Sequence, residues 1–287
     1  MTEKIGFIGT GVMGNSMAFH LMRAGYDVHL YTRTKSKAEN LLEHGAVWEE
    51  SVADLAQHTD IIITMIGTPQ DVESVYFGAE GILENARANA YVIDMTTSKP
   101  SLAKKIYDAA KEKNIHALDA PVSGGDIGAR EASLTIMVGG DAVDFEAMEE
   151  IFEIMGENIV HQGDAGAGQY TKLANQIAIA PGMIGLAEAL VFSKNAGLDQ
   201  TTVLQSISAG AAGSWSMDNY GPRMIFRTFD PGFAIKHYIK DLRIAVEAAE
   251  EMNMNTPGLQ LALQIYEELG ETGELESGIH AIIKYFE

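Results

Sequence analysis

The sequence contains no cysteine, and this absence removes a group of functions from consideration. Without thiols the chain has no disulfide framework, no thiolate metal site and no cysteine nucleophile. Basic residues are also scarce, because 20 Lys and Arg stand against 40 Asp and Glu, which leaves a net charge of −20. A surface of this sign repels nucleic acid and anionic lipid. We therefore expect neither nucleic acid nor a membrane as a partner.

Long apolar stretches without polar or charged residues are also lacking. The first residues do not form the apolar segment typical of a signal peptide, and no later stretch reads as long and apolar enough to span a membrane. We therefore expect a cytoplasmic protein. The histidines have no ligand-like spacing, so no metal site is expected. With 287 residues, 46% of them hydrophobic, the chain is long enough for two domains with cores of their own.

A glycine-rich turn lies close to the N-terminus. Residues 4–8 form an apolar run typical of a buried strand, and a helical pattern that stops near Gly25 begins soon after it. Glycines in such a turn bring backbone N–H groups and a helix N-terminus against a pyrophosphate. A glycine turn without a ligand would have the same pattern. The position between strand and helix favours a dinucleotide site formed by Gly9, Thr10, Gly11, Val12, Met13 and Gly14.

The end of the second predicted strand, residues 26–31, indicates which dinucleotide is bound. NAD sites usually place an Asp or Glu there for the ribose hydroxyl, whereas this chain has Thr32-Arg33-Thr34. Arginine binds a phosphate through two parallel hydrogen bonds, and the threonine hydroxyls add donors. A solvated basic loop is the alternative interpretation. We predict a preference for NADP, with NAD possible, and assign Thr32, Arg33 and Thr34 to the cofactor.

Further strands alternate with helices through the first half of the chain. They are expected at 46–48, 61–65, 91–94, 116–122, 134–138 and 158–161, which predicts one α/β domain of parallel strands over residues 1–163. Ligands lie at the carboxyl ends of such strands, so Met65, Ile66 and Thr97 are assigned to the cofactor. Thr96 and Thr97 have the alternative of capping the next helix.

Ser123-Gly124-Gly125 follows the predicted strand at 116–122. Successive glycines expose backbone N–H groups without side-chain hindrance, and a serine hydroxyl adds a donor. This combination suits a carboxylate, although a plain turn has the same composition.

Only helical patterns follow residue 163. They cover about 166–196, 199–209, 235–253, 256–269 and 278–286, with a flexible glycine- and alanine-rich connection at 209–214. We expect a long connecting helix over residues 164–196 and an all-helical domain over 197–287. Pro181 removes a backbone hydrogen bond from the middle of the long helix and should kink or split it.

One lysine stands in the apolar part of this long helix. Lys172 and Asn175 are three residues apart and share a helical face, which places an amine beside an amide and suggests proton transfer to a held substrate. Lys240, in a later helix, is by itself typical of a lysine in contact with solvent.

Four motifs together resemble the β-hydroxyacid dehydrogenases, the family of 3-hydroxyisobutyrate dehydrogenase and tartronate semialdehyde reductase. They are residues 6–14, 119–125, 166–176 and 240–242, and the resemblance covers essentially the whole chain. It implies a Rossmann-like domain joined by a long helix to an all-helical domain, with the active site in the cleft between them. It also implies dimers or tetramers that assemble through the helical domain.

The resemblance implies a role for each matched residue. Lys172 is the implied catalytic residue and Asn175 positions the substrate or the lysine, while Ser123, Gly124 and Gly125 hold the substrate carboxylate. Thr97 and Lys240 are implied cofactor contacts, and we assign Gly124 and Phe233 to the cofactor as well. The pocket for the rest of the substrate is expected among Met95, Trp215, Met217, Phe233, Arg223 and His237.

These residues predict an NADP-preferring oxidoreductase that moves a hydride between the nicotinamide and a short 3-hydroxy acid or its semialdehyde. Candidate substrates are tartronate semialdehyde and glycerate, 3-hydroxyisobutyrate, succinic semialdehyde and serine-like acids. Three alternatives use the same fold: an imine reductase, a 6-phosphogluconate-type dehydrogenase and a non-catalytic nucleotide-binding module. Lys172 counts against the first and the last, and the lack of a clear basic pocket for a sugar phosphate counts against the second.

Overall fold

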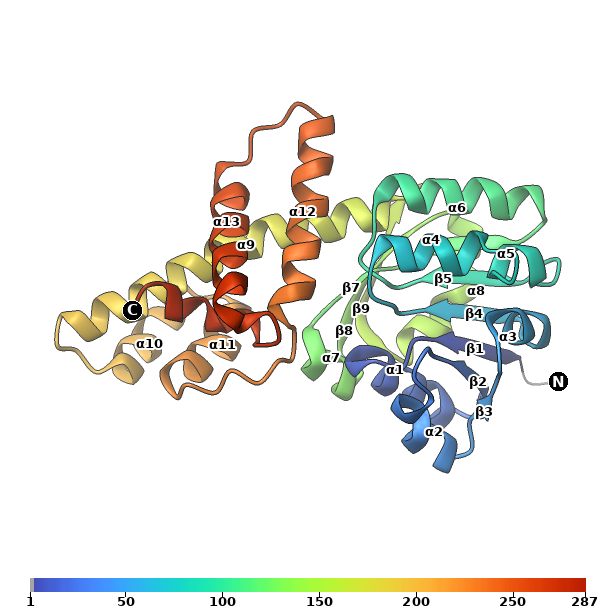
Figure 1. Ribbon diagram of the computed structural model, residues 1–287, viewed down its shortest axis with the longest axis horizontal. Coiled ribbons are helices and arrows are strands. Elements are labelled where there is room, and N and C mark those ends of the chain that lie inside the picture. Colours follow the sequence, from blue (N-terminus) through green and yellow to red (C-terminus); the bar gives the residue numbers. More distant parts are fainter. Residues whose placement is uncertain (1–2) are drawn as a thin grey trace. The chain divides into compact units, whose positions relative to one another are not determined.

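The computed structural model describes residues 3–287, and the chain folds into two compact units (Figure 1). The first unit ends at Lys172 and the second runs from Leu173 to Glu287. The first unit therefore includes the opening turns of the long helix α9 (Ala167–Asn195), and the second contains the rest of that helix.

A single twisted sheet forms the centre of the first unit. Within the described residues it has nine strands in the order β3-β2-β1-β4-β5-β6-β8-β7, with β9 paired to β8. The strands are β1 (Lys4–Ile8), β2 (Asp27–Tyr31), β3 (Val47–Trp48), β4 (Ile61–Thr64), β5 (Tyr91–Asp94), β6 (His116–Asp119), β7 (Val122–Ser123), β8 (Leu134–Gly139) and β9 (Gly156–Gly163). The six strands from β3 to β6 are parallel, in the 3-2-1-4-5-6 order of the Rossmann fold. The predicted fold is confirmed, and the strand order reverses between β1 and β4.

The strand predicted over residues 116–122 is two strands. β6 ends at Asp119, and the short β7 pairs antiparallel with β8. Pro121 separates the two, and proline has no N–H to donate to a ladder. Its carbonyl still accepts a hydrogen bond from the N–H of Met137 at 3.0 Å. This break places Ser123 at the sheet edge instead of in a continuing strand.

Helices cover both faces of the sheet. They are α1 (Val12–Arg23), α2 (Glu39–Glu43), α3 (Val52–His58), α4 (Pro69–Phe77), α5 (Ile82–Asn85), α6 (Pro100–Glu112), α7 (Gly125–Glu131) and α8 (Ala142–Glu153), with a 3₁₀ turn at Lys35–Ala38. No helix was predicted from the sequence at α2, α4, α5 or α7. A local signal for α4 was present, because Thr68 and Asp71 form a capping box around Pro69 at the first helical position.

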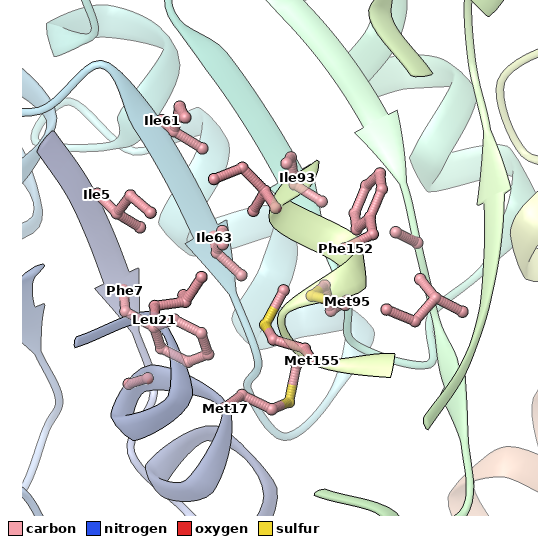
Figure 2. Close-up of a cluster of buried hydrophobic side chains, with 14 of the residues drawn as sticks. Ile5, Phe7, Met17, Leu21, Ile61, Ile63, Ile93, Met95, Phe152 and Met155 are labelled. Atoms are coloured by element: carbon pink, nitrogen blue, oxygen red, sulfur yellow. The ribbon is translucent and has the colours of Figure 1, made fainter. Parts of the chain in front are cut away.

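Two hydrophobic cores lie on opposite faces of this sheet because side chains alternate along each strand. Ile5, Ile63 and Ile93 point into one core with Leu21 of α1 and Phe152 of α8, as Figure 2 shows. The intervening residues of the same strands, such as Ile62 and Val92, point into the other core. That second core is completed by side chains from α3, α4, α5 and α6.

The second unit is entirely helical within its described residues. After α9 come α10 (Gln200–Ser208), α11 (Trp215–Ile225), α12 (Ile235–Glu251) and α13 (Pro257–Leu269), then a π-helical turn at Gly270–Glu274 and a 3₁₀ helix at Ile279–Tyr285. Helices α12 and α13 pack against each other, as do α10 and α11. The sequence interpretation missed α11, although Ser214 caps it by accepting a hydrogen bond from the N–H of Met217. The C-terminal helix was predicted, but its 3₁₀ form was not.

Helix α9 corrects two expectations. It runs from Ala167 to Asn195 with Pro181 inside it, so the proline does not split the helix. By length and composition α9 could also cross a membrane. The expectation that no stretch of the chain is long and apolar enough to do so is therefore wrong. Half of its apolar window is buried inside the protein, and a buried core helix has the same properties.

Candidate active site

The glycine turn after β1 has the geometry of a pyrophosphate site. Gly9 has a φ of 100°, and a Cβ added there would lie 2.3 Å from the carbonyl oxygen of Met65. A Cβ on Gly14 would lie 2.0 Å from the carbonyl oxygen of Gly9, whereas one on Gly11 would meet nothing within 4 Å. The first and third glycines are thus required by the tight turn and by close packing, and the second leaves open space for a ligand. The N-terminus of α1 has no side-chain cap, so its N–H groups suit an anion.

Thr32, Arg33 and Thr34 follow β2 directly. The Arg33 side chain is 79% exposed, and its Nη1 lies 3.0 Å from Oδ1 of Asp71, which forms the capping box of α4 with Thr68. Thr32 is half-buried and Thr34 is exposed. An exposed guanidinium beside a carboxylate can exchange that partner for a phosphate at little cost, because surface ion pairs contribute little.

The loops after β4 and β5 are joined by a hydrogen bond. The N–H of Ile66 donates to Oγ1 of Thr96 at 3.0 Å, and Thr96 is 1% exposed. Thr97, the next residue, is half-buried. The N-cap of α6 is Lys99, so the interpretation of the two threonines as helix caps is wrong.

Met95, the first residue of the loop after β5, points into the core of the first unit. Its side chain is 0% exposed and belongs to the hydrophobic core that Figure 2 shows. Its expected place in the substrate pocket is therefore wrong.

Ser123 ends β7, Gly124 is the N-cap of α7 and Gly125 is the first residue of that helix, all in the first unit. Gly124 and Gly125 have φ angles of 130° and 62°, a region that favours glycine. A Cβ added to Gly125 would meet nothing within 4 Å, so its backbone faces open space. Ser123 is half-buried. This geometry leaves the backbone accessible to a small anion.

Helix α9 begins against the carboxyl edge of the sheet. The Asp119 carboxylate, at the end of β6, accepts hydrogen bonds from the N–H groups of Gly166 at 2.7 Å and Gln169 at 2.8 Å. Burial raises the pKa of this carboxyl to about 6, although the two N–H donors act in the opposite direction. A Cβ on Gly168 would lie 2.3 Å from the carbonyl oxygen of Met137. Only glycine allows the helix to start this close to the sheet.

Lys172 lies three residues after Gln169 on α9, and its side chain is 7% exposed. Lysine is rarely buried to this degree unless a partner or a function requires it. The predicted amine is therefore held inside the protein, on a helix whose first turn is fixed to the sheet.

The second unit contains a buried polar cluster that includes Asn175 and Lys240. Asn175 Nδ2 donates to Oε1 of Gln176 at 3.0 Å, and Gln176 Nε2 donates to Oδ2 of Asp241 at 2.7 Å. Lys240 Nζ lies 2.8 Å from Oδ1 of the same carboxylate, and the lysine side chain is 19% exposed. The interpretation of Lys240 as a solvent-facing lysine is therefore wrong. The half-buried Phe233 lies in the same unit, 5.5 Å from the ring of Tyr238.

Three of these buried polar residues were not predicted from the sequence to have a role. Gln169, Gln176 and Asp241 are at most 2% exposed, and each makes a hydrogen bond or an ion pair. A polar side chain on the apolar face of a helix was the signal that could have identified them. Within residues 3–287, no three His, Asp or Glu side chains gather in a way that could hold a metal.

The strand order and the glycine geometry define a dinucleotide-binding protein. Residues 4–163 match the model of the NAD binding domain of 6-phosphogluconate dehydrogenase. Residues 166–286 match the model described as NAD-binding of NADP-dependent 3-hydroxyisobutyrate dehydrogenase. The chain belongs to the β-hydroxyacid dehydrogenase family, whose members are NAD(P)-dependent oxidoreductases.

Similar proteins support the family across the full length. An uncharacterized oxidoreductase of Bacillus subtilis, YkwC, is 58% identical over 99% of both chains. The 2-hydroxy-3-oxopropionate reductase of Escherichia coli is 38% identical over 99% of this chain and 97% of its own. The solved structure of Mycobacterium tuberculosis 3-hydroxyisobutyrate dehydrogenase with L-serine has a TM-score of 0.90 and 29% identity, covering 100% of this chain and 99% of that one.

Proposed function

We propose that this protein is an NADP-preferring oxidoreductase that interconverts short 3-hydroxy acids and their semialdehydes, with Lys172 as general acid and base. The observation that carries the proposal is a lysine with 7% exposure on a helix fixed to the carboxyl edge of a Rossmann sheet. The E. coli relative is named for 2-hydroxy-3-oxopropionate, a three-carbon semialdehyde acid, and the M. tuberculosis structure contains L-serine, a 3-hydroxy acid. Both names support a substrate of this size and charge.

Each residue has a defined part in the proposed reaction. When bound, the nicotinamide cofactor supplies or accepts the hydride. In reduction, the Lys172 ammonium donates a proton from Nζ to the substrate oxygen, and in oxidation the neutral amine accepts the hydroxyl proton. The ammonium also stabilises negative charge on that oxygen in the transition state. Ser123 and the N–H groups of Gly124 and Gly125 hold the substrate carboxylate, and Asn175 orients the substrate or the lysine.

The remaining proposed contacts belong to the cofactor. The glycine turn geometry supports a pyrophosphate at the N-terminus of α1. The proposed nicotinamide-side contacts are Met65, Ile66, Thr97, Gly124, Phe233 and Lys240. We place the reaction in the cytoplasm, and we take α9, half of whose apolar window is buried, as a core helix of the second unit. Recovery of the native protein in a washed membrane pellet would contradict that location.

Lys172→Ala should lower kcat about 100-fold or more, because it removes the proton donor from the reacting oxygen. Lys172→Arg keeps the positive charge but does not release a proton at working pH, so it should retain substrate binding and lose turnover. The measurement is NADPH consumption with tartronate semialdehyde, succinic semialdehyde, glyoxylate and methylmalonate semialdehyde, with a cyclic imine as the comparison. The assignment would be contradicted if Lys172→Ala kept nearly full turnover, or if the wild-type protein reduced only the imine and none of the aldehydes.

The preference for NADP is proposed to depend on Arg33. Arg33→Ala should raise the KM for NADPH about tenfold or more and leave the KM for NADH nearly unchanged, because a hydrogen bond between two charged groups contributes about 1.5–3 kcal/mol. Arg87→Ala is the matched control, since Arg87 is also exposed and lies 3.3 Å from a carboxylate oxygen, that of Asp60 at the start of β4. Equal kcat/KM for the two cofactors in the wild type would show that the preference does not exist.

A further inference from the structure

Gln169 makes paired hydrogen bonds that span the residue Thr97. Its Oε1 accepts from the N–H of Ser98 at 2.8 Å, and its Nε2 donates to the carbonyl oxygen of Thr96 at 2.8 Å. The side chain is 0% exposed. The two ends of one amide therefore bind the backbone on both sides of Thr97. We call this arrangement the Gln169 bridge.

The Gln169 bridge continues in both directions within the first unit. The main-chain N–H of Gln169 donates to Asp119, as described above. On the other side, the N–H of Thr96 donates to Oδ1 of Asp94 at 3.1 Å, and Thr96 Oγ1 accepts from Ile66. The loops after β4, β5 and β6 are thus connected to the first turn of α9 through groups that are largely buried. Buried hydrogen bonds of this kind stabilise one arrangement, because breaking one leaves a desolvated polar group without a partner.

The position of the bridge relates two groups of the proposed reaction. Thr97 lies between the two bonded backbone groups, and Lys172 lies one helical turn beyond Gln169 on α9. A shift of the β5 loop along the helix would therefore change the distance between Thr97 and Lys172. A misplacement of about 1 Å can cost about 100-fold in rate when reacting groups must be aligned.

We propose that Gln169 is a positioning residue, which holds the Thr96–Ser98 backbone at a set distance from the Lys172 turn of α9. This inference rests on the proposed function for its effect on turnover, whereas its structural part stands independently. Neither a long apolar side chain nor a carboxylate can replace the amide, since the site needs one acceptor and one donor at fixed positions.

The first test replaces Gln169 with Met, which has a similar length and forms neither hydrogen bond. We expect kcat to fall about tenfold or more, while the Kd for NADPH, measured by fluorescence, changes less than about threefold. Amide hydrogen exchange in a peptide covering residues 95–98 should become faster. Thr59→Val is the matched control, because the buried Thr59 hydroxyl donates to the carbonyl oxygen of Leu55 at 2.7 Å near the amino end of β4. It should lower stability without changing kcat or the exchange of residues 95–98.

The second test is Gln169→Glu, which separates positioning from loss of packing. An ionised carboxylate repels the carbonyl oxygen of Thr96, whereas a protonated carboxyl restores one donor and one acceptor. The activity of this variant relative to wild type should therefore be lowest at pH 8 and recover toward pH 6, and Gln169→Met should show no such recovery.

Two results would overturn the positioning role. The first is that amide hydrogen exchange of residues 95–98 is unchanged in Gln169→Met. The second is that Gln169→Met keeps a kcat within twofold of wild type while it loses as much stability as Thr59→Val. Failure of the proposed function looks different, because the wild type itself would then turn over none of the aldehydes. In that case faster exchange in Gln169→Met would still support the bridge, and unchanged exchange would reject it.

Discussion

Single buried polar side chains hold the functional segments of this protein in place. Asp119 and Gln169 are at most 4% exposed. The Asp119 side chain accepts two hydrogen bonds, and the Gln169 side chain accepts one and donates one, all between segments far apart in the sequence. A buried polar group destabilises a fold unless it is paired in this way. Such residues therefore make the first turn of α9 a precise attachment for Lys172.

His280 gives a prediction at the scale of one residue. Its ring is 0% exposed and stacks on Tyr220 and Phe229, and its Nε2 lies 2.7 Å from the carbonyl oxygen of Thr228. Burial lowers its pKa from 6.5 to about 4. Between these pH values the unfolded chain binds the proton and the folded chain does not, so stability is lost as pH falls from about 6.5 to about 4.

His280→Gln should remove this pH-dependent loss, because an amide can still donate to Thr228 and does not titrate. Urea unfolding at pH 7 and pH 5 should show that wild type loses about 2 kcal/mol more than the variant over this interval. His44→Gln is the control, since His44 is exposed and its Nδ1 donates to the carbonyl oxygen of Asn40 at 2.6 Å. Identical pH dependence in wild type and His280→Gln would contradict the prediction.

At the scale of the element, Pro181 costs α9 one backbone hydrogen bond without ending the helix. Pro181 is exposed, and a Cβ added to Gly258, at the start of α13, would lie 3.4 Å from the proline Cβ. The ring therefore contacts the first turn of α13 where that helix has no side chain. The helix continues because tertiary packing on its other face, with buried residues such as Met183 and Leu186, outweighs the local penalty.

Pro181→Ala should raise the free energy of unfolding by about 1–3 kcal/mol, because it restores a donor inside the helix. Gly185→Ala is the comparison on the same helix, where an added Cβ meets nothing within 4 Å and the gain should be about 1 kcal/mol. Chemical denaturation of the three proteins is the measurement. A loss of stability in Pro181→Ala would mean that the contact with Gly258 contributes more than the missing hydrogen bond.

Two of the helices missed from the sequence, α7 and α11, share a physical cause. Helix α7 has seven residues, including two glycines, and directly follows Gly124, so its composition is typical of a turn. Helix α11 contains Gly221 and Pro222 in its interior, both unfavourable by propensity. Packing of α11 against α10, with Leu204 close to Gly221, stabilises it where local preference does not.

At the scale of the molecule, most of the exposed large apolar side chains among the described residues belong to the second unit. Its large apolar side chains that are at least half exposed are Phe192, Leu198, Phe226, Met252, Met254 and Leu261. We propose that this unit mediates assembly into a homodimer or homotetramer. Association would remove this surface from water.

Light scattering on the purified protein should give the mass of a dimer or tetramer. Phe192→Glu should shift it toward smaller species, because it places a charge on an α9 side chain that is 73% exposed. Val143→Glu is the matched control, since Val143 is 74% exposed but lies on α8 in the first unit. A monomer at micromolar concentration would reject the proposal.

The sequence by itself determined the Rossmann sheet, the helical second unit and the glycine turn. These features depend on short-range patterns, namely unbroken apolar runs in strands, helical periodicity and the conformational freedom of Gly9. Only the tertiary structure decided that Lys240 is held by Asp241, that Met95 is a core residue, and that Gln169 binds the Thr96–Ser98 backbone. The contacts of Met95 and Gln169 join residues that are distant in the chain, and no local preference of either partner specifies the other. Lys240 and Asp241 are neighbours in sequence, but Gln176 of α9 binds the same carboxylate from 65 residues away.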